Sequence, residues 1–343
     1  MKAVRIHGHG GPEVLSVDDV DEPVAGPGQV LVRVLGVSIN HLDLWVRRGM
    51  PGFPVEFPRV LGCDGTGEIV ALGEGVRAFS PGQKVVLEPG YTSAGEEWDR
   101  AGQDHLAPDY SIRGEHGDGF DTELVAIDAK YVFPLPDGLD PVQAAAVPLV
   151  FLTAWGMIER AQLEAGETVL VLGAASGVGS AAVQIARHLG ARVLATAGTD
   201  EKRALACELG AEECIDHYRD DWPGEVKRLT DGLGADVVVE HIGPATWAGS
   251  MRSLARLGRL VTCGGTTGPK VSVMLPHLFM KNQSVLGSTM GPRGALPVIF
   301  DRVARGHYRP VVDSVLPMSA VREAHERLEA KNASGKIVLE PGK

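Results

Sequence analysis

The sequence of 343 residues has few cysteines, no long apolar run and no signal-peptide pattern. It contains four cysteines, Cys63, Cys207, Cys214 and Cys263, and no two of them form a C-x-x-C pair or a disulfide framework. It has no run of about 18 consecutive apolar residues, and its first residues, MKAVRIHGHGG, lack the apolar core of a signal peptide. These absences predict a cytoplasmic protein with no membrane partner.

Basic charge is also scarce. Lys and Arg number 33 against 44 Asp and Glu, which gives a formal net charge of -11. Because nucleic-acid surfaces hold phosphates mainly through clustered Lys and Arg, this balance argues against a nucleic-acid partner. The sequence does have 44% apolar residues and 44 glycines, which is typical of a globular, turn-rich α/β protein. Its length favours two domains.

The first part of the chain, to about residue 127, consists of short strand-like runs broken by Gly and Pro. The runs are KAVRI, QVLVRVLGVSI, GEIVALG, QKVVLEP and TELVAI. This spacing predicts a compact, mostly antiparallel β-domain. A polar stretch over 91–120 interrupts the rhythm, and so long an insertion in a compact domain generally has a function.

After about residue 142, apolar strands alternate with helical segments. The strands are TVLVLG, RVLATA, ADVVVEHIG and RLVTCGG, and the alternation indicates an α/β fold whose parallel sheet is covered on both faces. The stretch 143–161 predicts one long buried helix, and the stretch 251–258 predicts another. The helix AVREAHERLEA and the strand GKIVLE close the sequence.

A glycine-rich turn lies between an apolar strand and a helix in TVLVLGAASGVGSAAVQIARHLGA, which is the setting of a dinucleotide-binding fingerprint. Backbone N–H groups at the start of the helix would hold a pyrophosphate there. Gly177 and Gly179 allow close backbone approach, although Ala174 and Ser176 replace the first two glycines of the strict motif. An ordinary strand-to-helix turn is the alternative, and the surrounding alternation argues against it.

The end of the second strand determines the choice of cofactor, because an acid there binds the ribose of NAD and repels the 2′-phosphate of NADP. Ala197 occupies that place, and Lys202 follows one helical turn later. The sequence therefore predicts NADPH, with NADH as the alternative. The residues predicted around the phosphate are Gly198, Thr199, Lys202 and either Arg203 or His217. In the alternative interpretation, Lys202 and Arg203 only solvate a helix face.

Eight phrases spread along the chain carry a family resemblance: GPEVL, INHLDLWVRRG, PRVLGCDGTGEIVALGEGV, PGQKVV, PLVFLTAW, AASGVG, LGSTM and GKIVL. On these phrases the chain resembles the medium-chain dehydrogenase/reductase superfamily, the zinc alcohol dehydrogenase and quinone reductase group. The resemblance implies a GroES-like catalytic β-domain over 1–148 and 292–343 and a Rossmann domain with a doubly wound parallel sheet over 149–291. It also implies an active site in the cleft between them, and a homodimer or homotetramer.

The resemblance further implies which positions bind the dinucleotide. They are Thr153, Ser176, Gly177, Val178, Gly179, Gly198, Thr199, Lys202, His217, Gly243, Gly264, Ser288 and Lys336.

Departures from the zinc members predict a protein without zinc. Where those members hold the catalytic metal with a cysteine, a histidine in a G-H-E phrase and a further cysteine or acid, this sequence has Asn40, Cys63 and Leu149, with Asp64 in the glutamate position. Zinc needs about three protein donors, and Leu149 provides none. The four cysteines of the structural zinc correspond to Ser93, Glu96, Asp99 and Ala107. Acidic residues of this lobe form either a weak cation site or a solvated face.

The catalytic residues predicted from these positions are Asn40, Asp43 and Cys63. Asn40 would contact the substrate carbonyl or the nicotinamide, with a turn-capping role as the alternative. Asp43 would orient Asn40 or form an ion pair with Arg47 or Arg48. Cys63 would be a reactive thiol or, as the adjacent carboxylate favours, a small buried core residue.

The predicted activity follows from the missing metal, because alcohol oxidation depends on a Lewis acid and reduction of an enone or quinone demands less. The sequence predicts a zinc-independent, NADPH-dependent oxidoreductase that transfers hydride to a small enone or quinone. The tyrosine that zinc-free members often carry in the phrase NHLDLWVRRG is missing, and Trp45 lies nearby instead. Two alternatives stay open: a zinc-type alcohol dehydrogenase with an irregular site, and a non-catalytic NADPH-binding protein.

Overall fold

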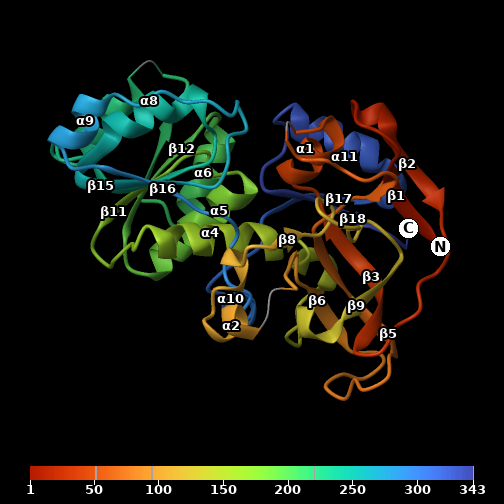
Figure 1. Cartoon of the computed structure of the whole chain (residues 1–343). Helices are drawn as coiled ribbons and strands as arrows, with labels where there is room; N and C mark the ends of the chain where they lie inside the picture. Colours follow the sequence, from red (N-terminus) through yellow and green to blue (C-terminus); the bar gives the residue numbers. More distant parts are fainter. Residues whose placement is uncertain (51, 94–95, 220, 343) are drawn as a thin grey trace. The chain divides into compact units, whose positions relative to one another are not determined.

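The computed structural model describes residues 1–50, 52–93, 96–219 and 221–342, and the chain divides into two compact units (Figure 1). Unit 1 comprises Met1–Leu149 and Pro292–Lys343, and unit 2 comprises Val150–Gly291. The first and last parts of the sequence therefore fold together in unit 1.

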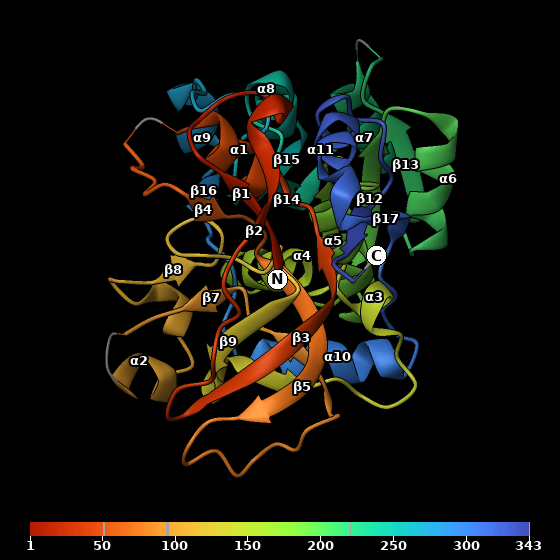
Figure 2. The ribbon, with the colours of Figure 1, turned by 90° about the vertical axis from the view of Figure 1, so that its right-hand side faces the viewer.

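A seven-stranded sheet forms the centre of unit 1, and its long strands β3 and β5 lie side by side in Figure 2. Its order is β10-β6-β5-β3-β18-β17, with β9 also paired to β3. The strands are β3 (Gln29–Ser38), β5 (Asp64–Leu72), β6 (Lys84–Leu87), β9 (Leu124–Asp128), β10 (Val132–Pro134), β17 (Val312–Pro317) and β18 (Lys336–Glu340). In β3 the valines 30, 32 and 34 are buried and Arg33 is exposed, so one face packs on the core. The predicted antiparallel β-domain is confirmed, with β17 and β18 as a parallel pair.

Smaller elements surround this sheet. A second sheet contains β1 (Lys2–Ile6), β2 (Leu15–Asp19) and β4 (Arg59–Val60), and a short hairpin contains β7 (Gly90–Tyr91) and β8 (Ser111–Ile112). The α-helices of unit 1 are α1 (His41–Arg48), α2 (Glu96–Arg100), α3 (Pro141–Ala144), α10 (Ala295–Ala304) and α11 (Val321–Glu329). Helix α4 (Pro148–Arg160) begins at the end of the first segment of unit 1 and continues into unit 2.

Unit 2 is a parallel sheet in the order β13-β12-β11-β14-β15-β16. Its strands are β11 (Thr168–Val171), β12 (Arg192–Ala197), β13 (Glu213–Asp216), β14 (Ala235–Glu240), β15 (Leu254–Thr262) and β16 (Ser284–Gly287). Its helices are α5 (Gly177–His188), α6 (Asp200–Glu208), α7 (Trp222–Leu229), α8 (Pro244–Ser253) and α9 (Leu275–Met280). The strand order reverses at β11, and in Figure 1 helices α8 and α4 lie on opposite sides of the strands. The predicted doubly wound Rossmann sheet is confirmed.

Two helix predictions are wrong. The stretch 143–161 is broken between α3 and α4, because Pro148 has no N–H to continue the helical ladder. The stretch 251–258 is mostly strand, because α8 ends at Ser253 and Leu254 pairs with Ala235 of β14. Sheet pairing overrides helix propensity there.

The broken stretch Pro141–Arg160 is also, among the described residues, one segment long and apolar enough to cross a membrane. Since 83% of its most apolar window is buried, it resembles the core helix of a globular fold.

An arginine, Arg293, contacts two aspartates of the polar stretch over 91–120 and lies near Glu88, just before that stretch. The Nη2 atom of Arg293 lies 3.0 Å from Oδ1 of Asp99, and its backbone N–H donates to Oδ1 of Asp104 at 3.0 Å. Its Nε atom lies 3.9 Å from Oε2 of Glu88, which is 1% exposed. Burial raises the pKa of Glu88 well above its usual range, and the Arg293 charge opposes that rise.

Other members of the lobe are held differently. The backbone N–H of Ser93 donates to Oδ2 of Asp109 at 2.8 Å, and Ala107 is buried. The side chain of Glu96 lies outside the described part of the chain. Asp99 and Asp104, two of the acidic residues of this lobe, thus have a guanidinium and a backbone amide of Arg293 as partners.

Replacing Arg293 with Met should lower the free energy of unfolding by about 3 kcal/mol, because Glu88 and Asp99 lose a counter-charge inside the fold. Urea denaturation at pH 7 measures the loss. In the double variant E88Q/R293M part of the loss should return, since a neutral amide needs no cation. Equal losses in the single and double variants would show that the charge of Glu88 is irrelevant.

Candidate active site

The ends of three neighbouring strands of unit 1 bring a polar cluster together. Strand β3 ends at Ser38, and antiparallel pairing places the start of β5, at Asp64, directly opposite it. The other neighbour, β18, begins at Lys336 and also runs antiparallel to β3. Asn40 follows β3 as the N-cap residue of α1. Residues distant in sequence therefore meet at one end of the sheet.

Asp64 is the centre of this cluster and is fully buried. Its Oδ1 atom accepts the backbone N–H of Leu149 at 2.7 Å. Its Oδ2 atom accepts the hydroxyl of Ser38 at 2.7 Å, Nδ2 of Asn40 at 2.8 Å and Nζ of Lys336 at 3.2 Å. A buried carboxylate with four donors is well compensated.

The carboxamide of Asn40 is oriented on both sides. Its Oδ1 atom accepts a hydrogen bond from Nζ of Lys336. Its Nδ2 group has three internal acceptors, Asp64, the carbonyl oxygen of Ser38 at 3.1 Å and Sγ of Cys63 at 3.2 Å. Asn40 is thus brought together with Cys63, and its hydrogen-bonding groups are already engaged within the cluster.

Asp43 orients the backbone around this cluster. Its Oδ2 atom accepts the backbone N–H of Asn40 at 2.7 Å, and its Oδ1 atom accepts the backbone N–H of Gly62 at 3.1 Å. The predicted ion pair with Arg47 or Arg48 is wrong, because both arginines bind Glu329. The reason is that α11 packs against α1 and supplies its own carboxylate to that face.

The thiol of Cys63 is fully buried. Burial, followed by the nearby Asp43 and Asp64 charges, raises its pKa well above the usual range. Since the thiolate is the reactive form, this environment favours an inert core thiol over a nucleophile.

Sequence reasoning missed Asp121, which lies against Gly62. Both of its carboxyl oxygens are buried without a hydrogen-bond partner among the described residues. Burial, and after it the charges of Asp43 and Asp64, raises its pKa well above the usual range. A Cβ atom on Gly62, whose φ is +89°, would lie 2.2 Å from Oδ1 of Asp121, so glycine is required there. No motif marked this aspartate, because its neighbours come from sheet pairing.

The residues predicted to bind the dinucleotide lie, with one exception, in unit 2. Ser176, Gly198, Gly243, Gly264 and Ser288 each follow a parallel strand, so they share the carboxyl edge of the sheet. This edge, at the reversal of strand order, is where doubly wound sheets bind nucleotides. Thr153 lies in α4, where its hydroxyl contacts Sδ of Met290 at 3.7 Å. The exception is Lys336, in the cluster of unit 1.

The glycine-rich turn has the geometry that a pyrophosphate needs. The Oγ atom of Ser176 caps α5 by accepting the backbone N–H of Gly179 at 3.0 Å. A Cβ atom on Gly179 would lie 2.3 Å from the carbonyl oxygen of Gly173, so glycine lets the helix pack tightly on the strand. The first N–H groups of α5, at Gly177 and Val178, lack intrahelical acceptors and suit an anion.

At the end of β12, Thr199 caps α6 by accepting the backbone N–H of Lys202 at 3.3 Å. His217 contacts the hydroxyl of Thr196 through Nδ1 at 3.2 Å. A Cβ atom on Gly198 would lie 2.4 Å from the Tyr218 ring, so glycine keeps this edge open. Arg203 binds Asp200 and lies 3.5 Å from Asp216, and Lys202 and His217 are the other basic residues predicted at this edge.

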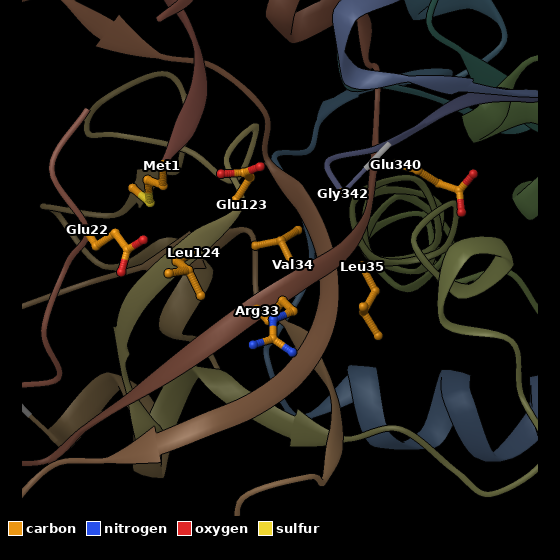
Figure 3. A pocket seen from close by; sticks show the side chains of 9 residues that line it. All are labelled: Met1, Glu22, Arg33, Val34, Leu35, Glu123, Leu124, Glu340 and Gly342. Carbon is orange, nitrogen blue, oxygen red and sulfur yellow. The ribbon is translucent and has the colours of Figure 1, made fainter. Parts of the chain in front are cut away.

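A separate pocket lies on unit 1 (Figure 3). It is lined by Met1, Glu22, Arg33, Val34, Leu35, Glu123, Leu124, Glu340 and Gly342. Its lining includes none of the residues of the Asp64 cluster, so it is not the candidate site.

Comparison with known proteins agrees with this geometry. Residues 26–137 match the family profile described as alcohol dehydrogenase GroES-like domain, and residues 177–305 match zinc-binding dehydrogenase. A quinone oxidoreductase of Pseudomonas aeruginosa is 32% identical, with 99% of each chain covered. The chain belongs to the medium-chain dehydrogenase/reductase superfamily.

Other members of this superfamily include alcohol dehydrogenases. An NAD-dependent alcohol dehydrogenase of Sulfolobus acidocaldarius is 30% identical, with 99% of each chain covered. A solved structure described as an NAD-dependent alcohol dehydrogenase is 43% identical, with a TM-score of 0.95 and 99% of each chain covered. The chain is therefore an oxidoreductase of a superfamily that binds nicotinamide dinucleotides.

The catalytic zinc implied by the superfamily does not fit the residues present. Of the three ligand positions, Leu149 offers only a backbone N–H, which donates to Asp64, and Oδ1 of Asn40 is taken by an ammonium. Within the described residues, no group of three or more His, Cys, Asp or Glu is arranged to hold a metal ion.

The protonation of Asp43 should make stability depend on pH. Burial raises the pKa of Asp43 from 3.8 to about 6, so the folded protein keeps a proton that the unfolded chain releases between these values. The contribution of the Asp43 carboxyl group to the free energy of unfolding should therefore fall by on the order of 3 kcal/mol as the pH rises from 4 to 6.

Urea denaturation of wild type and Asp43→Asn at pH 4, 5, 6 and 7 measures this effect. The curve of the variant should be flatter, since its amide does not titrate, and Asp137→Asn at an exposed site should follow wild type. Parallel curves for wild type and D43N would rule out the raised pKa.

Proposed function

We propose that the protein is an NADPH-dependent reductase of enones or quinones that works without zinc. The observation that carries the proposal is the Asp64 cluster, in which Asn40 bonds to Cys63 and Lys336 while the backbone N–H of Leu149 bonds to Asp64. Such a cluster is poor at activating an alcohol but can hydrogen-bond to an oxygen on which charge develops. The 32% identity to a quinone oxidoreductase supports the same reading.

The cofactor, when bound, supplies a hydride from its nicotinamide ring. The first turn of α5 would hold the pyrophosphate, and Gly198, Thr199, Lys202 and His217 would surround the 2′-phosphate of NADPH. Support comes from Ala197 at the end of β12, where an NAD-binding member would carry an acid.

A zinc-type alcohol dehydrogenase remains the second candidate, because the 43% identical solved structure is described as an NAD-dependent alcohol dehydrogenase. The two candidates differ in metal, cofactor and substrate, so they can be separated directly. A protein that binds NADPH and turns over nothing is the third.

Chelation is the decisive experiment. Purified protein should contain well under one zinc per chain by elemental mass spectrometry, and NADPH oxidation with an enone and quinone panel should be unchanged after prolonged treatment with a chelator. About one zinc per chain, with alcohol oxidation lost on chelation, would establish the second candidate. NADPH binding without turnover across the panel would establish the third.

Cofactor preference should depend on Lys202. The variant Lys202→Ala is expected to lower kcat/KM for NADPH about tenfold and to leave kcat/KM for NADH nearly unchanged, because a charge-assisted bond to the 2′-phosphate is lost. Steady-state kinetics with both cofactors measure the ratio.

The matched control is Arg203→Ala, which removes the same charge one residue along from a side chain already paired with Asp200 and Asp216. Its cofactor ratio should stay at the wild-type value. An equal change in both variants would mean that the preference comes from the overall charge of α6.

The proposed assembly is a homodimer in the cytoplasm, with a homotetramer as the alternative. Support comes from the edge of the unit 2 sheet, where β16 pairs with β15 on one side. Large apolar side chains are exposed beside it, namely Leu275, Phe279, Met280 and Val285. An apolar patch of this kind is typical of a protein contact. The small number of cysteines supports a reducing compartment.

A further inference from the structure

The Asp64 cluster contains more carboxyl groups than cations. Three carboxyl groups, of Asp43, Asp64 and Asp121, are at most 2% exposed. Lys336, 4% exposed, donates to Asp64 and Asn40, and its charge opposes the rise in the pKa of both Asp43 and Asp121. Buried carboxylates need a partner cation, and here it is a side chain.

The location of this ammonium is informative. In zinc members the positions of Asn40, Cys63 and Leu149 face a metal. In this chain Lys336 binds Asn40 and Asp64, while Asn40 contacts Cys63 and Asp64 contacts the backbone of Leu149. Asn40 is therefore hydrogen-bonded to the ammonium directly. Cys63 is linked to it through Asn40, and Leu149 through Asp64.

The ammonium of Lys336 can also donate one more hydrogen bond. It carries three N–H donors. Two have acceptors, Oδ1 of Asn40 and Oδ2 of Asp64, and no third acceptor is found among the described residues. The remaining hydrogen is a donor of the strength that an oxyanion needs.

We propose that Lys336 takes the place of the catalytic metal: its ammonium is the fixed cation of the Asp64 cluster and donates its remaining hydrogen bond to the substrate oxygen. The second half rests on the reductase function proposed above. It differs from the role that the resemblance implies for Lys336, which is contact with the dinucleotide.

In the proposed reaction NADPH, when bound, would supply a hydride that forms a C–H bond at the β-carbon of the enone, and NADP⁺ would be left. The electron pair of the C=C bond would shift so that negative charge develops on the carbonyl oxygen. The Lys336 ammonium would stabilise this enolate without losing its proton, and water would give the proton that completes the new C–H bond at the α-carbon, leaving hydroxide.

The first test is whether the ammonium excludes a metal. Asn40→Cys places a second thiol beside Cys63 and Asp64, which makes three donors suited to a divalent ion. With Lys336 retained, N40C should bind Co²⁺ weakly, and N40C/K336A should bind it at least about 100-fold more tightly, since a neighbouring positive charge is removed. Thiolate-to-cobalt absorption during titration of the full chain measures both affinities.

Equal cobalt affinity in N40C and N40C/K336A would overturn the proposal. A third variant, N40C/K336R, keeps a cation and should exclude cobalt as N40C does, and tight binding there would likewise overturn it. This test does not depend on enzymatic activity, so it stands even if the reductase function fails.

The second test separates the substrate role from a cofactor role. Lys336→Met should lower kcat/KM for an enone about 100- to 1,000-fold, the usual cost of losing one oxyanion donor, while the Kd of NADPH, from nucleotide fluorescence, stays within about twofold. Lys84→Met, at an exposed site on β6, controls for loss of a lysine and should match wild type.

If K336M weakens NADPH binding as much as it lowers kcat/KM, or leaves both unchanged, the substrate role is wrong. Methylamine gives a further readout: it should restore part of the turnover of K336A, whose smaller side chain leaves room for the added ammonium. Absence of rescue in a folded K336A that binds NADPH normally would count against the proposal. A wild type inactive on the whole panel would instead reject the reductase function.

Discussion

The candidate site of unit 1 depends on the hydrogen bonds that the buried carboxylate of Asp64 accepts. It accepts hydrogen bonds from Ser38, Asn40, Leu149 and Lys336, which come from three separate parts of the chain. A buried charge is tolerated only when such donors surround it, so the same group that would be costly alone orients its neighbours. The directions of the Asn40 amide and the Lys336 ammonium both follow from it.

In the polar lobe, the guanidinium of Arg293 is likewise a side-chain cation close to carboxylates. Arg293 contacts Asp99 and Asp104 and lies near Glu88, in the lobe that the family resemblance compares with the structural-zinc lobe of the zinc members. Both Arg293 and Lys336 come from the second segment of unit 1. A side-chain cation cannot dissociate, but its reach is limited by its backbone, so the geometry of each site is tied to where that segment runs.

Much of the fold could be predicted from the sequence, because local patterns carry it. Strand β12 matches the predicted run RVLATA, and the turn at Ser176 to Gly179 has the cap and close packing that its residue types require. The helix predicted over 251–258 is wrong, because most of this stretch is strand β15, which pairs with β14. Local periodicity cannot report a neighbour that lies elsewhere in the chain.

The candidate site was harder to predict for the same reason. Asn40, Asp43 and Cys63 were found through their positions in recognisable phrases, and the structure brings them together. The partners of Arg47 and the burial of Asp121 depend on α11 and on the loop beside Gly62, and no spacing in the sequence reveals them. The ammonium of Lys336 belongs to this cluster through the register of β18 beside β3.

Strand β18 pairs with β3 on one side and β17 on the other, yet it is synthesised after the whole of unit 2. While unit 2 is being synthesised, β9 already pairs with the first half of β3, but the end of β3 at Val37 and Ser38 lacks β18 and Asp64 lacks Lys336. Completion of the central sheet and placement of the Lys336 ammonium beside Asp64 then coincide, because both depend on β18. A nascent chain that stops before residue 336 would therefore lack the last strand of this sheet and the cation of the Asp64 cluster together.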